Sequence, residues 1–276
     1  MDERTGIAKM TCGLIVNPSS GKRSGYGTAL AGKLENKAGV HVRVLERFEE
    51  LSGRLDELAD LGVTSLFISS GDGTVQQIQT ELAERRPFDT LPDLGLLPHG
   101  TTNMTAADLG LGTQNLDEQA RIIADADYRT QKTARRTRPT VRIANPADGQ
   151  VRHGMFVGTG ALWRGTVFCQ QAVHKTGLRG EWATFATLAA AIVRSLVSKA
   201  GGQDPERISQ PHEMTGKAAD GTVVTGDQLF FLATTLDKLI LGSRPFWGPK
   251  SAGLRASIFP YPPPSVPRWL WKSMYG

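Results

Sequence analysis

A carboxylate between two glycines is the feature of this sequence best suited to chemistry. Asp72 stands between Gly71 and Gly73, directly after the apolar run 66–69 and before 75–85, where apolar residues recur at helical spacing. This pattern predicts a buried strand that turns tightly into a helix. Glycines let the backbone approach a ligand closely, and the N–H groups at a helix N-terminus favour an anion. A carboxylate at such a turn suits a magnesium ion that accompanies a phosphate.

Two further loops follow the same logic. The segment Asn17-Pro18-Ser19-Ser20-Gly21 follows the apolar run 10–16, and Pro98-His99-Gly100-Thr101-Thr102-Asn103 follows the run 94–97. Each loop alone is as often structural as functional. Together, small polar loops at several strand ends suit a polyphosphate nucleotide. None of them is a Walker loop and no Gly-x-Gly-x-x-Gly occurs, which argues against P-loop NTPases and standard Rossmann dehydrogenases.

The elements that must position these loops alternate in the first half of the chain. Strands are expected at 10–16, 40–45, 66–69 and 94–97, and helices at 26–37, 49–59, 75–85, 102–108 and 116–126. Such alternation predicts a mostly parallel sheet between two helical layers, an α/β/α domain. Because parallel strands end at one edge, the loops should gather there, where open α/β sheets bind ligands.

The second half is rich in strand signals. Strands are expected at 140–144, 150–157, 223–224, 229–234 and 254–259, with one helix at 181–199 and a polar loop at 201–213. This pattern predicts a mainly antiparallel domain of the β-sandwich type. We therefore expect a nucleotide-binding α/β domain over residues 1–135 and a β domain over 136–276.

Composition narrows the class of protein. The 276 residues are 39% hydrophobic and 21% charged, with a net charge of +5, as in an ordinary globular protein. The positive charge suits an anionic substrate or a membrane surface, but no dense basic block of the nucleic-acid-binding kind occurs. Cys12 and Cys169 are far apart, which favours free thiols and a cytoplasmic location. We expect neither a signal peptide nor a membrane span, because the longest apolar stretch, 182–197, is short and contains Arg194.

The three motifs together resemble the diacylglycerol kinase catalytic family. That family includes bacterial lipid kinases and sphingosine kinases, and it is more distantly similar to NAD kinases and 6-phosphofructokinases. The order and spacing of the segments 17–21, 70–74 and 97–103 agree with the family pattern. The resemblance is close over residues 1–110 and weak beyond them. It implies a nucleotide-binding domain followed by a β-sandwich, with ATP and Mg²⁺ as cofactors and a lipid hydroxyl as phosphoryl acceptor.

The resemblance also implies a set of site residues. Asp72 would lie close to the magnesium ion and organise catalysis. The residues expected to bind the nucleotide are Asn17, Pro18, Ser19, Ser20, Gly21, Gly71, Asp72, Gly73, Thr74, Gly100, Thr101 and Asn103. Backbone N–H groups and one metal-binding carboxylate suit phosphoryl transfer, which needs mostly positioning and neutralisation of charge. The partners would be ATP, a lipid and the inner surface of a membrane, and a homodimer stays open.

Several positions depart from the family pattern. Ser70 replaces a glycine, Gln77 a glutamate and Met104 an aspartate, and the stretch Ala252-Gly253-Leu254-Arg255-Ala256 lacks two expected carboxylates. A late Asp-Gly-Glu that would supply the general base is not found, and Asp220-Gly221-Thr222 comes too early. Either the sequence stops before that strand, or another acid serves, or the protein transfers no phosphate. Two alternatives therefore stay open: an NAD kinase-like enzyme acting on a soluble hydroxyl, and a nucleotide- or lipid-binding protein without catalysis.

Overall fold

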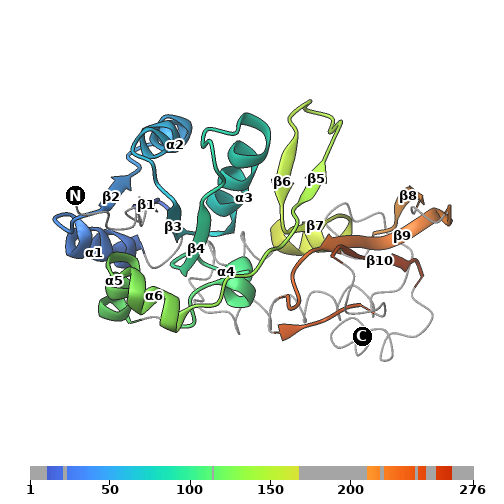
Figure 1. Cartoon of the computed structure of the whole chain (residues 1–276). Coiled ribbons are helices and arrows are strands. Elements are labelled where there is room, and N and C mark those ends of the chain that lie inside the picture. The colour runs from blue at the N-terminus through green and yellow to red at the C-terminus, as the bar shows by residue number, and fades with distance from the viewer. Residues whose placement is uncertain are drawn as a thin grey trace. The chain divides into compact units, whose positions relative to one another are not determined.

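The computed structural model describes residues 11–20, 24–113, 115–167, 210–217, 221–239, 242–246 and 253–262. The chain forms two compact units (Figure 1). The first contains residues up to Met155 and takes back the segment Leu236–Ile240, and the second contains Phe156–Thr235 and residues from Leu241 on.

A four-stranded parallel sheet forms the centre of the first unit. Its strands are β1 (Cys12–Val16), β2 (Val40–Val44), β3 (Ser65–Ser70) and β4 (Asp93–Pro98), in the order β2-β1-β3-β4. All four lie within two residues of the predicted strands at their carboxyl ends. Because β1 and β3 are neighbours, the loops that follow them lie side by side, and the loop after β4 lies next to them.

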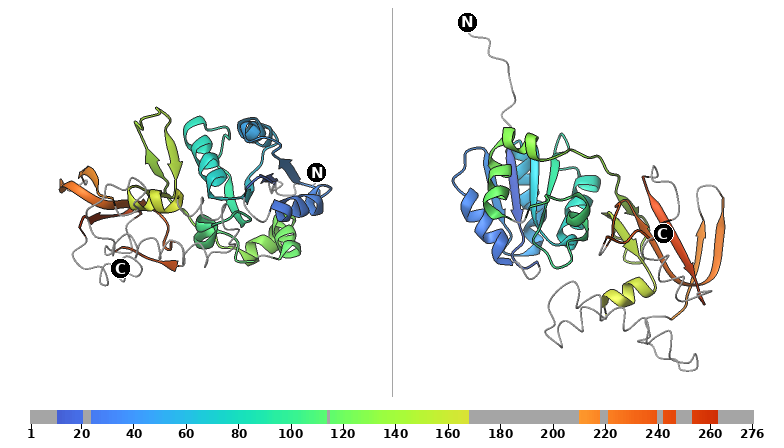
Figure 2. Two further views of the ribbon diagram at one scale, coloured as in Figure 1. Left: turned by 180° about the vertical axis from the view of Figure 1, so that it is seen from behind. Right: turned by 90° about the horizontal axis from the view of Figure 1, so that it is seen from below.

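Helices cover both faces of this sheet, as the right-hand view of Figure 2 shows. They are α1 (Ser24–Leu34), η1 (Phe48–Glu50) leading into α2 (Leu51–Asp60), α3 (Asp72–Thr80) with its wider continuation η2 (Glu81–Arg85), α4 (Met104–Leu109), α5 (Leu116–Ala124) and α6 (Ala126–Lys132). The predicted α/β/α arrangement is confirmed.

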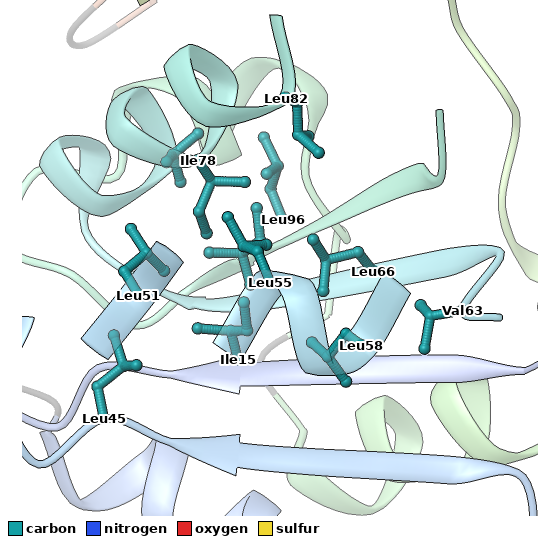
Figure 3. Close-up of a cluster of buried hydrophobic side chains, with 12 residues drawn as sticks. Ile15, Leu45, Leu51, Leu55, Leu58, Val63, Leu66, Ile78, Leu82 and Leu96 are labelled. Atoms are coloured by element: carbon teal, nitrogen blue, oxygen red, sulfur yellow. The ribbon is translucent and has the colours of Figure 1, made fainter. Parts of the chain in front are cut away.

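Strand residues alternate between two apolar clusters. Ile15 of β1 packs with the buried leucines of α2 and with Ile78 of α3 (Figure 3). Leu14 and Val16, its neighbours along the strand, pack on the opposite face against α1 and α5. Successive side chains of a strand point to opposite faces, so one fully buried strand anchors both helical layers. The carboxyl ends of the strands are therefore held in place by packing on both faces of the sheet.

The second unit contains an antiparallel sheet. Its strands are β7 (Phe156–Gly158), β8 (His212–Lys217), β9 (Val223–Thr234) and β10 (Arg255–Pro260), and each of the others pairs with β9. The predicted antiparallel character of the second half is confirmed, but 223–224 and 229–234, expected as two strands, form the single strand β9. The expected helix at 181–199 lies outside the described residues.

A hairpin precedes the second unit. It consists of β5 (Val141–Ile143) and β6 (Arg152–Gly154), and by its contacts it goes with the first unit. The stretch 150–157, expected as one strand, is divided between β6 and β7. The domain boundary at 135/136 stays a prediction, while the compact units divide after Met155.

Two elements were not predicted. α6 was not expected because its residues are mostly polar or charged, and the residue that it buries is an arginine, Arg129. β8 has no alternation of apolar and polar residues, since most of its side chains are exposed at the end of β9. Periodicity detects only elements with a buried face.

Candidate functional site

Three loops meet at the carboxyl edge of the parallel sheet. We call residues 17–20 the first loop, 71–74 the second and 99–103 the third. The backbones of the second and third loops touch: a Cβ built on Gly100 would overlap the Cα of Gly71 and approach Oδ1 of Asn103 to 2.9 Å. Glycine is therefore required at position 100 for steric reasons. At this contact the two loops meet backbone to backbone, with no side chain between them.

Side-chain hydrogen bonds join the first loop to the second loop and to the end of β3. Asn17 donates through Nδ2 to Oγ1 of Thr74 at 3.0 Å, and Ser70 donates through its hydroxyl to Oγ of Ser20 at 3.0 Å. Ser20 in turn donates to the carbonyl of Asn17 at 2.8 Å. Thr74 is 4% exposed, so these contacts lie at the boundary between core and loop. Ser70, which replaces a glycine of the family pattern, thus gains a partner in the first loop.

The first turn of α3 presents backbone donors. Gly71 precedes the helix in an extended conformation, and no side chain caps this end of α3 in the described structure. Gly73 is exposed, and a Cβ placed there would meet no atom within 4 Å. An uncapped helix N-terminus beside open space is suited to bind an anion such as a phosphate.

Asp72 lies in this turn, but its carboxylate points to another helix. Its Oδ2 accepts a hydrogen bond from the backbone N–H of Met104 at 3.0 Å, and its Oδ1 accepts one from that of Thr105 at 2.9 Å. These are the first two residues of α4. Asp72 therefore caps α4 from the second loop.

The third loop is closed by its own asparagine. Asn103 accepts from the N–H of Gly100 through Oδ1 at 2.6 Å and donates through Nδ2 to the carbonyl of Gly100 at 2.9 Å. Its φ of 51° lies in the left-handed region, which asparagine tolerates better than most residues. Thr101 and Thr102, which lie between the hydrogen-bonded residues Gly100 and Asn103, are exposed. The hydroxyls of the loop are thus open to a ligand, while the N–H of Gly100 is already used.

A buried polar pair lies beneath the loops. Ser69 and His99 are 1% and 3% exposed, and the Ser69 hydroxyl is 2.8 Å from Nδ1 of His99. The ring of Tyr26 packs 5.9 Å from that of His99, centroid to centroid. His99 thus joins the third loop to β3 through Ser69. Sequence reasoning missed Ser69 because it reads as the end of a strand.

A polar network attaches the hairpin β5–β6 to the outer side of α3. Thr80 accepts from the N–H of His153 at 2.9 Å, and Gln76 donates to the carbonyl of His153 at 3.0 Å. The ring of His153 lies 2.7 Å from Oε1 of Glu84 through Nε2, and Arg142 donates to the same oxygen at 2.9 Å. These hydrogen bonds, that of Arg142 first, lower the pKa of Glu84 from 4.5 to about 2. The hairpin therefore holds α3 and its continuation η2 through contacts at Gln76, Thr80 and Glu84.

The structure thus brings most of the predicted site residues together. Direct contacts link Asn17, Ser20, Gly71, Asp72, Thr74, Gly100 and Asn103 across the three loops. Ser19 and Thr101 are exposed, Pro18 is half-buried, and Gly21 lies outside the described residues. Gln77, in place of the family's glutamate, donates to Glu81 at 3.2 Å. Ala256, in place of an expected carboxylate, is the second residue of β10.

The donor set fits a magnesium ion brought by a nucleotide better than a metal cage of protein side chains. Among the described residues, no group of three or more His, Cys, Asp or Glu side chains could hold a metal ion. Magnesium is commonly held by one or two carboxylates together with phosphates and waters. Each oxygen of Asp72 accepts one backbone hydrogen bond and keeps further acceptor capacity. One carboxylate beside an anion-binding turn meets this requirement.

Comparison with known proteins agrees with this geometry. Residues 11–135 match the sequence profile of the family described as "Diacylglycerol kinase catalytic domain". This confirms the resemblance stated from the motifs. The matched segment contains all three loops, α4 and α6.

Curated relatives match about a third of the chain. "Probable lipid kinase YegS-like" from Enterobacter sp. (strain 638) is 33% identical over 98 residues, which cover 36% of this chain and 32% of that protein. "Probable lipid kinase YegS" from Escherichia coli O9:H4 (strain HS) is 32% identical over 88 residues, covering 32% of this chain and 29% of that protein. The matches thus span about a third of the length of these relatives.

Solved structures share the fold. A diacylglycerol kinase from Bacillus anthracis str. Sterne superposes with a TM-score of 0.57 at 19% identity, covering 91% of this chain and 74% of that one. Within the described part of the chain, no helix is long and apolar enough to cross a bilayer.

Proposed function

We propose that this protein is an ATP-dependent lipid kinase that transfers the γ-phosphate of ATP to a lipid hydroxyl of the diacylglycerol type. The observation that carries the proposal is the meeting of the three loops around an uncapped helix N-terminus. The match of residues 11–135 to the diacylglycerol kinase catalytic profile supports the same reaction.

In this proposal the second loop binds the phosphates. The N–H groups at the start of α3 face an anion, and the glycines at 71 and 73 let it approach the backbone. Asn17 fixes Thr74 from one side and Asp72 fixes α4 from the other, so the donors are held before the ligand arrives. Donors held in place need no reorganisation during the reaction, which is the main source of electrostatic catalysis.

Magnesium would be held by the nucleotide phosphates and by Asp72. When bound, it neutralises charge that develops on the transferred phosphoryl group. Asp72 is the acid that the second loop supplies for this purpose.

We further propose that the protein acts at the inner surface of a membrane, from the cytoplasm. A lipid acceptor resides in a bilayer, and the chain carries a net charge of +5, which favours an anionic surface. Lys and Arg side chains near such a surface contribute about 1 kcal/mol each.

A phosphoryl-transfer assay tests the proposal. Purified protein is mixed with ATP labelled at the γ-phosphate, MgCl₂ and vesicles that contain diacylglycerol, monoacylglycerol, sphingosine or phosphatidylglycerol. We expect label in one lipid class and at least a tenfold lower rate for Asp72→Asn. Equal rates for the wild type and the variant would contradict the role of Asp72, and label transfer to NAD would favour the NAD kinase-like alternative.

A second candidate is a nucleotide- or lipid-binding protein without catalysis. It is favoured by Met104, Ala252 and Ala256, which occupy positions where the family pattern has carboxylates. ATP binding with no label in any lipid, and no ADP released in the presence of vesicles, would support this candidate over the kinase.

A further inference from the structure

We propose that Asp72 acts as a positioning residue, whose carboxylate caps α4 and thereby holds the third loop in the conformation that receives the nucleotide. This inference rests on the proposed nucleotide site. It adds a role for Asp72 that is exerted without a metal ion.

The start of α4 depends on a cap from outside. Asn103 precedes the helix, the position at which a side chain usually accepts from the first turn. Here it adopts left-handed dihedral angles and makes no capping bond, because its amide is engaged with Gly100. The N–H groups of Met104 and Thr105 therefore turn to the carboxylate of Asp72. An ionised carboxylate at this end also interacts favourably with the helix dipole.

The other end of α4 is fixed to the sheet. Gly110 donates to the carbonyl of Ala106 at 2.8 Å, and Leu111 donates to that of Leu96 in β4 at 3.0 Å. A Cβ on Gly110 would approach the Leu96 carbonyl oxygen to 2.7 Å, so the chain passes close to the strand here. A helix of six residues is too short to be stable by itself. Its N-terminal turn, and with it the third loop, is therefore held in place by the two hydrogen bonds to Asp72.

The positioning role and a metal-ligand role predict opposite effects on nucleotide bound without metal. A carboxylate beside phosphates repels them when no cation intervenes, so its removal strengthens binding of metal-free ATP if charge alone matters. If Asp72 holds the third loop, its removal lowers the population of the competent conformation and weakens binding of the same ligand. The sign of the change therefore separates the two roles.

The experiment measures the dissociation constant of labelled ATP in excess EDTA by equilibrium dialysis. The variants are Asp72→Ala, which removes both acceptors, and Asp72→Asn, which keeps one. The matched control is Asp125→Ala: Asp125 lies outside the three loops and caps α6 by accepting from the N–H of Tyr128 at 2.9 Å. A thermal melt of each ligand-free protein reports the loss of the cap.

We expect metal-free ATP to bind about 5- to 30-fold more weakly to Asp72→Ala than to the wild type. This ratio corresponds to the loss of a helix cap that contributes about one to two kcal/mol. The loss of affinity should be smaller for Asp72→Asn. Asp125→Ala should lower the melting temperature of the free protein while its affinity for ATP stays that of the wild type. Unchanged or tighter binding by Asp72→Ala would overturn the inference, as would an equal loss of affinity in Asp125→Ala. A wild type that binds no ATP with or without Mg²⁺ would instead overturn the proposed nucleotide site, and this inference with it.

Discussion

Asn17 donates through its side-chain amide to the hydroxyl of Thr74 at 3.0 Å, across 57 residues of sequence. The bond joins the end of β1 to the first turn of α3. Because the Thr74 side chain is 4% exposed, the hydroxyl is withdrawn from water and its orientation is fixed by the asparagine. Two loops that would otherwise move independently therefore form one surface.

Replacing Thr74 by valine should loosen this surface. Thr74→Val keeps the shape of the side chain but removes the acceptor for Asn17, and a lost hydrogen bond of this kind costs about 0.5–1.5 kcal/mol. Urea denaturation measures the free energy of unfolding. Thr130→Val, which removes an exposed bond within α6, is the control and should change stability less. Equal stability of Thr74→Val and the wild type would contradict the structural role of the bond.

Glycines 73 and 100 should respond to alanine in opposite ways. A Cβ at Gly100 meets the backbone of Gly71, which cannot yield, so Gly100→Ala should lower the free energy of unfolding by about 1–3 kcal/mol. Gly73 lies in α3 with open space beside it, so Gly73→Ala should leave stability unchanged or raise it by up to about 1 kcal/mol.

Nucleotide binding then separates these two variants further. If the phosphates occupy the open space beside Gly73, the methyl group of Gly73→Ala intrudes on them. We expect weaker ATP binding in a fully folded protein, measured by isothermal titration calorimetry. Unimpaired binding by Gly73→Ala would place the phosphates elsewhere.

The hairpin β5–β6 should become less stable in acid. The pKa of Glu84 is lowered from 4.5 to about 2 by Arg142 and His153, so the folded protein keeps this carboxylate ionised where the unfolded chain protonates it. Its contribution to stability is complete above about pH 4.5 and is lost as the pH falls toward 2. The protection factors of the backbone amides in residues 141–154, which are corrected for the change of the intrinsic exchange rate with pH, should therefore fall over this range.

Glu84→Gln tests the assignment. It should lower the protection factors in the hairpin at neutral pH and reduce their further fall between pH 4.5 and 2. Asp148, whose pKa is also lowered to about 2, by Arg152 first, lies in the same hairpin and retains its own share of the acid response. A hairpin that exchanges identically in the wild type and Glu84→Gln over the whole range would contradict the network.

The buried guanidinium of Arg129 should stabilise the end of α5. It is 8% exposed and donates to the carbonyls of Ile122 and Ile123 at 3.3 and 3.1 Å and to Sγ of Cys12 at 3.0 Å. Hydrogen bonds from a charged donor contribute about 1.5–3 kcal/mol each, so Arg129→Ala should lose at least about 2 kcal/mol in urea denaturation. Arg135→Ala, at an exposed ion pair with Asp93, is the control and should lose less than about 1 kcal/mol. Similar losses for both variants would contradict the role of Arg129.

The strands and the three loops could be predicted from the sequence because their signals are local. Buried strands show as apolar runs, and the loops follow them as glycine-containing polar segments. The same reasoning correctly grouped Asn17, Asp72 and Asn103 at one sheet edge.

The partners of these residues could not be predicted. Asp72 accepts hydrogen bonds from backbone N–H groups. Every residue except proline has such a group, so no residue type in the sequence indicates this contact. The docking of His153 on Thr80 joins residues 73 apart, and neither lies in a recognisable motif. Sequence pattern thus located the site, while the function of its aspartate as a cap required the three-dimensional structure.

Hydrogen exchange in the presence of ATP tests most directly the central claim that the three loops form a nucleotide site. Backbone amides are compared with and without saturating ATP and Mg²⁺ in the wild type and in Asp125→Ala. The account predicts slower exchange in 17–20, 70–76 and 99–106, with little change in α5 and α6. Protection confined to other parts of the chain, with these three segments unaffected, would contradict it.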